Sequence, residues 1–153
     1  MDAIDQKILA CLQTNAAMPI EEIAAQAGLS ASPCWRRIQK LEAAGVIRAR
    51  VALLDPARMN VGVTVFVAVR TNQHNAEWAE RFCRAVRKIP EVVEFYRMSG
   101  ETDYLLRVVV PDIAAYDLVY QRLIKVADLF DVSSNFAIEC IKYTTALPTH
   151  YAS

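Results

Sequence analysis

Residues 28–45 read GLSASPCWRRIQKLEAAG, and this stretch decides the fold of the N-terminal part of the chain. Gly28 supplies a tight turn, because glycine adopts left-handed backbone conformations without strain. Ser30 stands where a helix N-cap belongs, and Pro33 falls in the first helical turn, where no intrahelical hydrogen bond is lost. Gly45 ends the helix. The pattern therefore predicts one helix between Ser30 and Gly45.

A rotation of about 100° per residue gives this helix two faces of different chemistry. Cys34, Ile38 and Leu41 fall within a narrow arc, which predicts a face that packs on other helices. Outside that arc or at its edges lie basic, polar and aromatic side chains: Trp35, Arg36, Arg37, Gln39 and Lys40. A helix that follows a glycine turn and has a basic free side is typical of a helix-turn-helix DNA-binding domain.

Two amphipathic helices are expected before this one. Asp2 is the expected N-cap of the first, and Pro19 suits the start of the second. Apolar residues at helical spacing make their inner faces: Ile4, Ile8, Leu9 and Leu12 in the first, and Ile20, Ile23, Ala24 and Ala27 in the second.

The distribution of charge along the chain says more about the class of partner than the net charge does. The chain has 17 basic and 17 acidic residues, yet residues 34–50 carry five basic residues against one acidic residue, a net charge of +4. A compact basic segment in a neutral chain indicates an anionic partner, but charge alone does not favour this over a helix face that only contacts solvent. Together with the turn spacing, the helix cap and the one-sided basic face, it favours double-stranded DNA as partner over a helical bundle that binds no DNA. The alternative is an amino-acid sensor without DNA affinity, and the basic segment weighs against it.

The pattern changes after Asp55–Pro56, where alternating apolar residues replace helical spacing. Strands are expected over residues 62–71, 92–98, 103–110 and much of 132–145, and helices over 75–89 and from 111. The order β-α-β-β-α-β is that of a ferredoxin-like fold, so the fold class is α+β. The expected organisation is a helix-turn-helix (winged-helix-like) domain over 1–50, a hinge over 51–60 and a ferredoxin-like domain over 61–153.

The apolar strands also predict self-association. They present more hydrophobic surface than two helices can cover, and the candidates for the excess are Phe66, Val108, Val110 and residues 138–141. About half of these must be ordinary core, because strand faces alternate. The remainder predicts a two-fold dimer through the C-terminal domain.

An enzyme is not expected. The sequence has no G-x-S-x-G elbow, no P-loop and no G-x-G-x-x-G motif, although ferredoxin-like domains can carry chemistry. The cysteines are dispersed and the two histidines lie far apart, which predicts reduced thiols, no metal site and no cofactor: Cys11, Cys34, Cys83, Cys140, His74 and His150. No apolar run approaches the ~20 residues of a membrane helix and no secretory signal opens the chain, so a cytoplasmic protein is expected.

Several segments resemble the Lrp/AsnC, or feast/famine, transcriptional regulators of bacteria and archaea. The matching segments have the right spacing along nearly the whole chain: 29–34 (LSASPC), 37–42 (RIQKLE), 45–47 (GVI), 54–56 (LDP) and 100–104 (GETDY). Three further segments are similar to a proteobacterial branch that includes cysteine-responsive regulators: 34–37 (CWRR), 97–100 (RMSG) and 141–145 (IKYTT).

The resemblance implies a nucleoid-associated regulator of amino-acid metabolism genes whose DNA binding or assembly responds to an amino acid. Together with the helix rotation, it implies these DNA-binding residues: Ser30, Ser32, Trp35, Arg36, Arg37, Gln39 and Lys40. We expect Ser32, Trp35 and Arg36 near base edges and Arg37 and Lys40 near phosphates. Arg37 stands at the edge of the buried arc, so pairing with an acidic side chain is its alternative role.

The resemblance also implies an effector site at the turn of residues 99–103, between subunits of dimers that join into tetramers or octamers. Gly100 permits close backbone approach, Asp103 supplies an anion for an ammonium group, and Thr102 supplies a hydroxyl. The candidate residues are Ser99, Gly100, Thr102, Asp103 and Tyr104, with Ser133 and Ser134 from a neighbouring chain. The first candidate ligands are cysteine, methionine and leucine. A plain β-turn, with no ligand, is the alternative for this segment.

Overall fold

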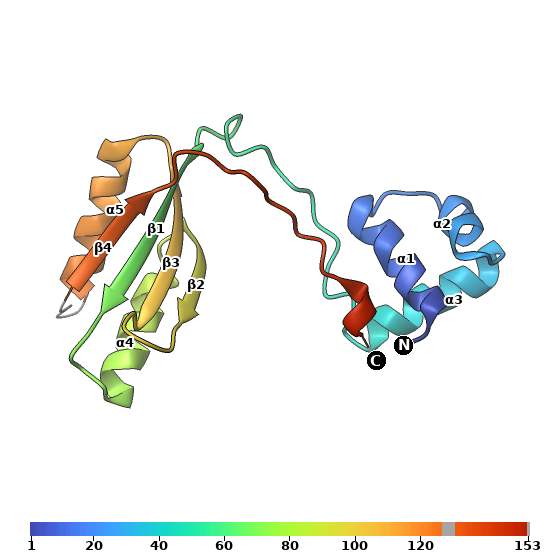
Figure 1. Cartoon of the computed structure of the whole chain (residues 1–153), viewed down its shortest axis with the longest axis horizontal. Helices are drawn as coiled ribbons and strands as arrows, with labels where there is room; N and C mark the ends of the chain where they lie inside the picture. Colours follow the sequence, from blue (N-terminus) through green and yellow to red (C-terminus); the bar gives the residue numbers. More distant parts are fainter. Residues whose placement is uncertain (127–130, 153) are drawn as a thin grey trace. The chain divides into compact units, whose positions relative to one another are not determined.

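The computed structural model describes residues 1–126 and 131–152, and these form two compact units (Figure 1). The first unit holds residues 1–52 together with the C-terminal segment from Ile141, and the second holds residues 53–140. Each unit has its own hydrophobic core. Among the described residues, no helix is long and apolar enough to cross a membrane.

Three helices pack together in the first unit: α1 (Ala3–Thr14), α2 (Ile20–Ala27) and α3 (Ala31–Ala43). The predicted inner face of α3 is confirmed, since Cys34, Ile38 and Leu41 are buried in the core that α1 and α2 share with it. Gly28 has a φ of 75° at the turn between α2 and α3. A side chain at this position would be strained, so the tight turn depends on glycine.

Two of the predicted helix starts differ in how they are capped. Asp2 caps α1 as predicted: its Oδ1 accepts hydrogen bonds from the N–H groups of Ile4 (3.0 Å) and Asp5 (2.9 Å). The N–H of Asp2 in turn donates to Asp5 Oδ2 at 3.1 Å, which completes a capping box. Ser30 occupies the N-cap position of α3, but its side chain makes no capping hydrogen bond. The prediction for Ser30 is therefore right in position only.

The winged-helix-like domain expected over residues 1–50 has no strand directly after α3. No strand is present in the described chain between α3 and residue 63. The N–H groups of Val46 and Ile47 both donate to the carbonyl of Leu41, at 2.9 and 3.2 Å. Because these bonds close the end of the helix, neither N–H is left for a strand partner.

By its contacts, the C-terminal segment from Ile141 groups with the first unit, whereas the predicted C-terminal domain runs over 61–153. The side-chain amide of Gln13 pairs with the backbone of Leu147: Nε2 donates to its carbonyl at 3.0 Å, and its N–H donates to Oε1 at 2.6 Å. A short 3-10 helix, Thr149–Tyr151, then packs on α1. These residues are more than 130 positions apart in sequence, so no local pattern indicates the contact.

The second unit is a four-stranded antiparallel sheet with two helices on one face (Figure 1). Its elements are β1 (Val63–Arg70), α4 (Ala76–Val86), β2 (Val92–Arg97), β3 (Tyr104–Val110), α5 (Ile113–Val126) and β4 (Asp131–Phe136). The strand order is β2-β3-β1-β4 and all three pairings are antiparallel. The predicted β-α-β-β-α-β order and the ferredoxin-like fold are therefore confirmed.

The last strand is shorter than predicted and ends at Phe136 instead of near residue 145. Its partner β1 begins at Val63, and the last hydrogen bond between them runs from the N–H of Ala137 to the carbonyl of Thr64 at 2.9 Å. Beyond that point β4 has no backbone to pair with, so the chain continues without a strand partner. Ile138 and Ile141 are accordingly almost fully exposed instead of lying in a strand.

Strand alternation divides the sheet into a core face and an open face. Val65, Val67 and Val69 of β1 point into the core beneath α4 and α5, together with Val108 and Val110 of β3, and all five are fully buried. Val108 and Val110 are therefore ordinary core. The residues on the opposite face include Phe66, 41% exposed, and Ala68, Leu105, Arg107, Val109, Ser133 and Asn135. Of the predicted apolar excess, Phe66 thus lies on the open face.

Candidate DNA-binding and effector sites

The predicted DNA-binding residues all come from α3 or its N-cap. Trp35 is 57% exposed, an unusual position for so large an apolar ring. The side chains on the same free side are also exposed: Ser30, Ser32, Arg36, Gln39 and Lys40. Burial of the Cys34–Ile38–Leu41 face forces this surface outward, because the two faces belong to one rigid helix. The helix therefore offers an aromatic ring, hydroxyls and cations to a partner.

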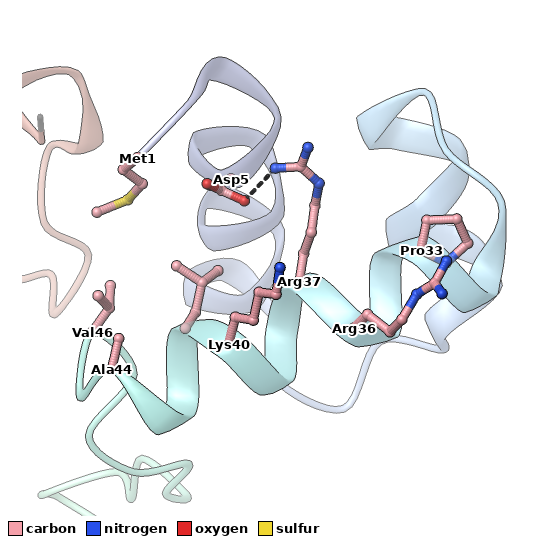
Figure 2. Close-up of a pocket in the computed structure, with 9 residues that line it drawn as sticks. Met1, Asp5, Pro33, Arg36, Arg37, Lys40, Ala44 and Val46 are labelled. Atoms are coloured by element: carbon pink, nitrogen blue, oxygen red, sulfur yellow. Dashed lines mark hydrogen bonds and ion pairs between the residues drawn. The ribbon is translucent and has the colours of Figure 1, made fainter.

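A groove of about 710 Å³ runs between the start of α1 and the free side of α3. Figure 2 shows Arg36 beside Pro33, Arg37 and Lys40 further along α3, and Met1 and Asp5 at the start of the chain and of α1. Within the described residues neither Arg36 nor Lys40 forms an ion pair. Both cations are therefore available to an anionic ligand at this groove.

Arg37 pairs with acidic side chains, which is the alternative role expected from its position at the edge of the buried arc. Its Nη1 lies 2.7 Å from Asp2 Oδ2 and 2.8 Å from Asp5 Oδ1, so it joins α3 to the N-terminus of α1 (Figure 2). The hydrogen bond from the Asp5 N–H, and then the one from Arg37, lower the pKa of Asp2 below its ordinary value. Asp5 and Asp2 raise the pKa of Arg37. Asp2 and Asp5 were not predicted as partners, although the Asp-x-x-Asp spacing of the capping box was a signal for them.

Two other polar residues of α3 are also held by a neighbour. Gln39 Nε2 donates to Glu42 Oε2 at 3.1 Å, and Glu42 Oε1 forms an ion pair with Arg50 Nη2 at 2.8 Å. Glu42 thereby neutralises one of the five basic residues of the 34–50 segment. In this segment, the basic side chains without an acidic partner among the described residues are Arg36, Lys40 and Arg48.

The turn predicted to hold an effector is closed by hydrogen bonds of Asp103. The N–H of Met98 donates to the carbonyl of Asp103 at 2.8 Å, and the N–H of Asp103 donates to the carbonyl of Val69 at 3.0 Å. The Asp103 side chain accepts the N–H of Thr71 on Oδ2 at 2.8 Å. Gly100 has a φ of 98°, so the turn requires a glycine at its tip. One oxygen of the carboxylate thus stabilises the turn, and Oδ1 is left for other contacts.

Tyr104 points away from this turn, into the core. Its ring centroid lies 5.1 Å from that of Phe82, 5.6 Å from Phe95 and 6.2 Å from Trp78. Burial raises the pKa of the Tyr104 hydroxyl. The structure therefore places Tyr104 among the residues that anchor the turn, whereas Ser99, Gly100 and Thr102 lie on its surface or half-buried in it.

Ser133 and Ser134 lie on opposite faces of β4. The Ser134 hydroxyl is hydrogen-bonded to the Tyr116 hydroxyl of α5, on the helix-covered face, where burial raises the pKa of Tyr116. Ser133 lies on the open face, opposite Ala68 of β1. Since Val69 bonds to Asp103, Ser133 and the turn lie at the same end of β1, one on each side of it. Among the described residues, no three His, Cys, Asp or Glu side chains lie together as a metal site would require.

Comparison with known proteins identifies the family. Residues 1–42 match the AsnC-type helix-turn-helix domain, and residues 64–147 match the Lrp/AsnC ligand binding domain. The chain belongs to the Lrp/AsnC family of transcriptional regulators. The resemblance stated from the sequence is thereby confirmed, and α3 lies almost entirely within the matched helix-turn-helix domain.

Two relatives match this chain over nearly its whole length. The DNA-binding transcriptional activator DecR of Escherichia coli strain K12 is 46% identical over 149 residues, which are 97% of this chain and 98% of DecR. The glutamate uptake regulatory protein of Zymomonas mobilis is 46% identical over 148 residues, 97% of this chain and 90% of that protein.

Solved Lrp/AsnC structures show the same fold. A crystal structure of an AsnC family regulator from Agrobacterium tumefaciens superposes with a TM-score of 0.96 at 59% identity, and each chain is covered completely. A Neisseria meningitidis regulator, solved as a complex with L-methionine, has a TM-score of 0.93 at 38% identity, with 99% of this chain and 98% of that chain covered.

The Arg37–Asp2 pair gives a prediction that a carboxyl titration can check. Replacing Arg37 with Gln removes one cause of the lowered Asp2 pKa, so the Asp2 pKa should rise. It should remain below its ordinary value, because the N–H of Asp5 still donates to Asp2. NMR titration of the Asp2 carboxyl carbon measures this. An unchanged Asp2 pKa in Arg37→Gln would contradict the pairing, and Arg36→Gln is the matched control because Arg36 does not contact Asp2.

The same pair makes stability depend on pH at the acidic side. Since the folded-state pKa of Asp2 is lowered, its contribution is complete above the carboxyl's ordinary value of 3.8 and is lost as the pH falls through the lowered value. Urea unfolding of the wild type and Arg37→Gln should therefore differ most above about pH 4 and converge below it. A difference that stays constant down to the lowest pH would contradict this origin.

Proposed function

We propose that this chain regulates transcription by inserting α3 into the major groove of operator DNA, and that it acts as a regulator at the nucleoid and not as an enzyme. The observation that carries the proposal is the exposed side of α3, where Trp35, Arg36 and Lys40 stand opposite a buried face. Hydrogen-bonding and aromatic side chains in the first turns of such a helix reach base edges, while cations further along neutralise phosphates.

The residues divide into three roles under this proposal. Ser32, Trp35 and Arg36 contact base edges, and Lys40 contacts a phosphate, with Ser30 and Gln39 at the margin of the same surface. Arg37 holds α3 against the capping box of α1 and so fixes the angle at which α3 is presented. We therefore propose positioning of α3, and not a direct phosphate contact, as the role of Arg37 to test first.

The DNA proposal predicts different effects for the two exposed cations of α3. Lys40→Ala should weaken binding to all sequences and lower the slope of log affinity against log salt by about one, because one phosphate contact is lost. Arg36→Ala should change the base preference, by about 1–3 kcal/mol at the base it contacts. Affinity selection from random duplexes, followed by anisotropy titrations at several salt concentrations, measures both effects.

Lys125→Ala is the matched control, because Lys125 is an exposed helix cation of the other unit. If the triple variant Arg36→Ala, Arg37→Ala, Lys40→Ala kept both its affinity and its sequence preference, α3 would not be the DNA-binding element.

We further propose that the turn of residues 99–103 binds an α-amino acid between subunits. Asp103 Oδ1 accepts the ligand ammonium group, while the backbone at Ser99 and Gly100 and the hydroxyl of Thr102 face the carboxylate. Ser133 of a neighbouring chain lies on the open sheet face and can close the site, whereas Tyr104 and Ser134 support it from the core. An L-methionine complex among the related structures supports an amino acid as the ligand class.

A ligand at such a site acts only if it favours one assembly or orientation over another. Asp103→Ala should therefore abolish amino-acid-induced changes in DNA affinity, and basal DNA binding should survive. Because Asp103 also accepts the Thr71 N–H, Asp103→Asn is the sharper variant: it keeps that acceptor and removes the charge. Calorimetry with cysteine, then methionine and leucine, should show a loss of binding of about tenfold or more in both variants. Binding by Asp103→Asn as tight as the wild type would place the site elsewhere.

The open sheet face supports a homodimer, the unit from which tetramers or octamers would form. Phe66, Leu105 and Val109 lie on this face with Ala68, next to the ion pair of Arg107 with Glu94. A second copy packed on it by two-fold symmetry would bury these side chains. Light scattering at micromolar concentration should give a mass of two subunits or an even multiple, and Phe66→Glu should lower it. A monomer for the wild-type chain would contradict the proposal.

A further inference from the structure

A second basic groove lies in the C-terminal unit, between α4 and β2. It encloses about 880 Å³ and is open to solvent. Its floor is apolar or aromatic and its rim is charged: Ala79, Cys83, Phe95 and Tyr104 below, and Glu80, Arg84, Arg87, Lys88 and Arg97 above. All nine residues belong to the same unit, and the DNA-binding face of α3 does not contribute to it.

The segment that forms one wall of this groove is more densely charged than the helix-turn-helix segment, and three of its four cations line the groove: Arg84, Arg87 and Lys88. Residues 81–88 read RFCRAVRK, which is four basic residues and no acidic one, a net charge of +4. All four are exposed, while Phe82 and Val86 between them are buried. Cations in the last turn of a helix are favoured by its dipole, but only by about 0.3–1 kcal/mol each, and the dipole amounts to roughly half a charge. The dipole therefore does not account for four cations, nor for Arg97, which comes from β2.

Three acidic side chains near this segment in sequence have partners: Glu80 pairs within the rim, and Glu91 and Glu94 pair outside it. Glu91 forms an ion pair with Arg122 of α5 at 3.3 Å, and Glu94 is paired with Arg107 on the open face of the sheet. Glu80 pairs with Arg84 at 2.5 Å. In the part of the chain that the structure describes, Arg87, Lys88 and Arg97 have no acidic partner. The rim thus keeps at least three uncompensated positive charges around one groove.

We propose that this groove binds the phosphate backbone of DNA, as a contact that is independent of base sequence. The inference rests on the chain binding DNA and adds a second contact to the one made by α3. The cations are exposed, which suits a polyanion held by counterion release. A small phosphorylated ligand would instead require buried, preorganised donors, and none of the rim side chains is buried. The half-buried Phe95 on the floor offers an apolar surface to deoxyribose.

The test compares two triple variants of the full chain with equal loss of charge. The groove variant carries Arg87→Gln, Lys88→Gln and Arg97→Gln, and the control carries Arg58→Gln, Lys125→Gln and Lys142→Gln, which are exposed and lie outside the groove. The probe is a random-sequence duplex of about 60 base pairs, titrated by fluorescence anisotropy at several salt concentrations. The groove variant should lower the salt slope by about two to three and the affinity at low salt on the order of tenfold. The control should leave the slope within about one of the wild type.

The remaining outcomes separate this inference from the role of α3. Arg36→Gln with Lys40→Gln should still weaken DNA binding in the groove variant, since the two contacts are independent. If the α3 variant weakens binding and the groove variant matches the control, the groove inference is overturned and the role of α3 stands. If calorimetry showed that the groove variant loses binding of inorganic phosphate while its DNA salt slope is unchanged, the groove would be a site for a small anion. The DNA inference would then be overturned as well. If light scattering showed that the groove variant has a lower oligomeric mass than the wild type, the groove would be a contact with another subunit, and the DNA inference would be overturned.

Discussion

Burial of one narrow face of α3 is the constraint on which the DNA-binding unit depends. Cys34, Ile38 and Leu41 can be covered only if α3 lies in the angle between α1 and α2, and a left-handed Gly28 makes the required turn. Once that face is inside, the helical period places Trp35, Arg36 and Lys40 outside. The N-terminus of α1 is then close enough for Asp2 and Asp5 to pair with Arg37. Packing of apolar residues thus positions the polar surface that we propose contacts DNA.

Strand β1 has the same organising position in the second unit, because it is hydrogen-bonded on both edges. Its alternation buries three valines under the helices and leaves Phe66 on the open face. Its C-terminal end holds Asp103 through the carbonyl of Val69 and the N–H of Thr71, while its N-terminal end limits β4 to Phe136. One strand therefore determines where the turn of residues 99–103 lies and where the last strand stops.

Electrostatics in this neutral chain depend on how acidic residues are distributed among the cations. Asp2 and Asp5 neutralise Arg37, Glu42 neutralises Arg50, and Glu94 is used by Arg107. Each pair also ties two segments together, although exposed pairs of this kind contribute little to stability. Their larger effect is on where positive charge remains unpaired: on the free side of α3 and on the rim of the groove between α4 and β2. A net charge of zero is therefore compatible with two strongly basic surfaces.

The sequence by itself determined the helix-turn-helix, the inner face of α3, the Asp2 cap and the order of strands and helices in the ferredoxin-like domain. Helical and strand periods, together with glycine, proline and capping residues, are local properties, and local properties can be seen in sequence. The tertiary structure decided the partner of Arg37, the end of β4, the inward direction of Tyr104 and Ser134, and the attachment of Leu147 to Gln13. Each of these depends on which distant segment lies alongside. The sequence contains many possible partners for a charge, a strand edge or a backbone amide, and only the folded structure determines which of them is close enough to bind.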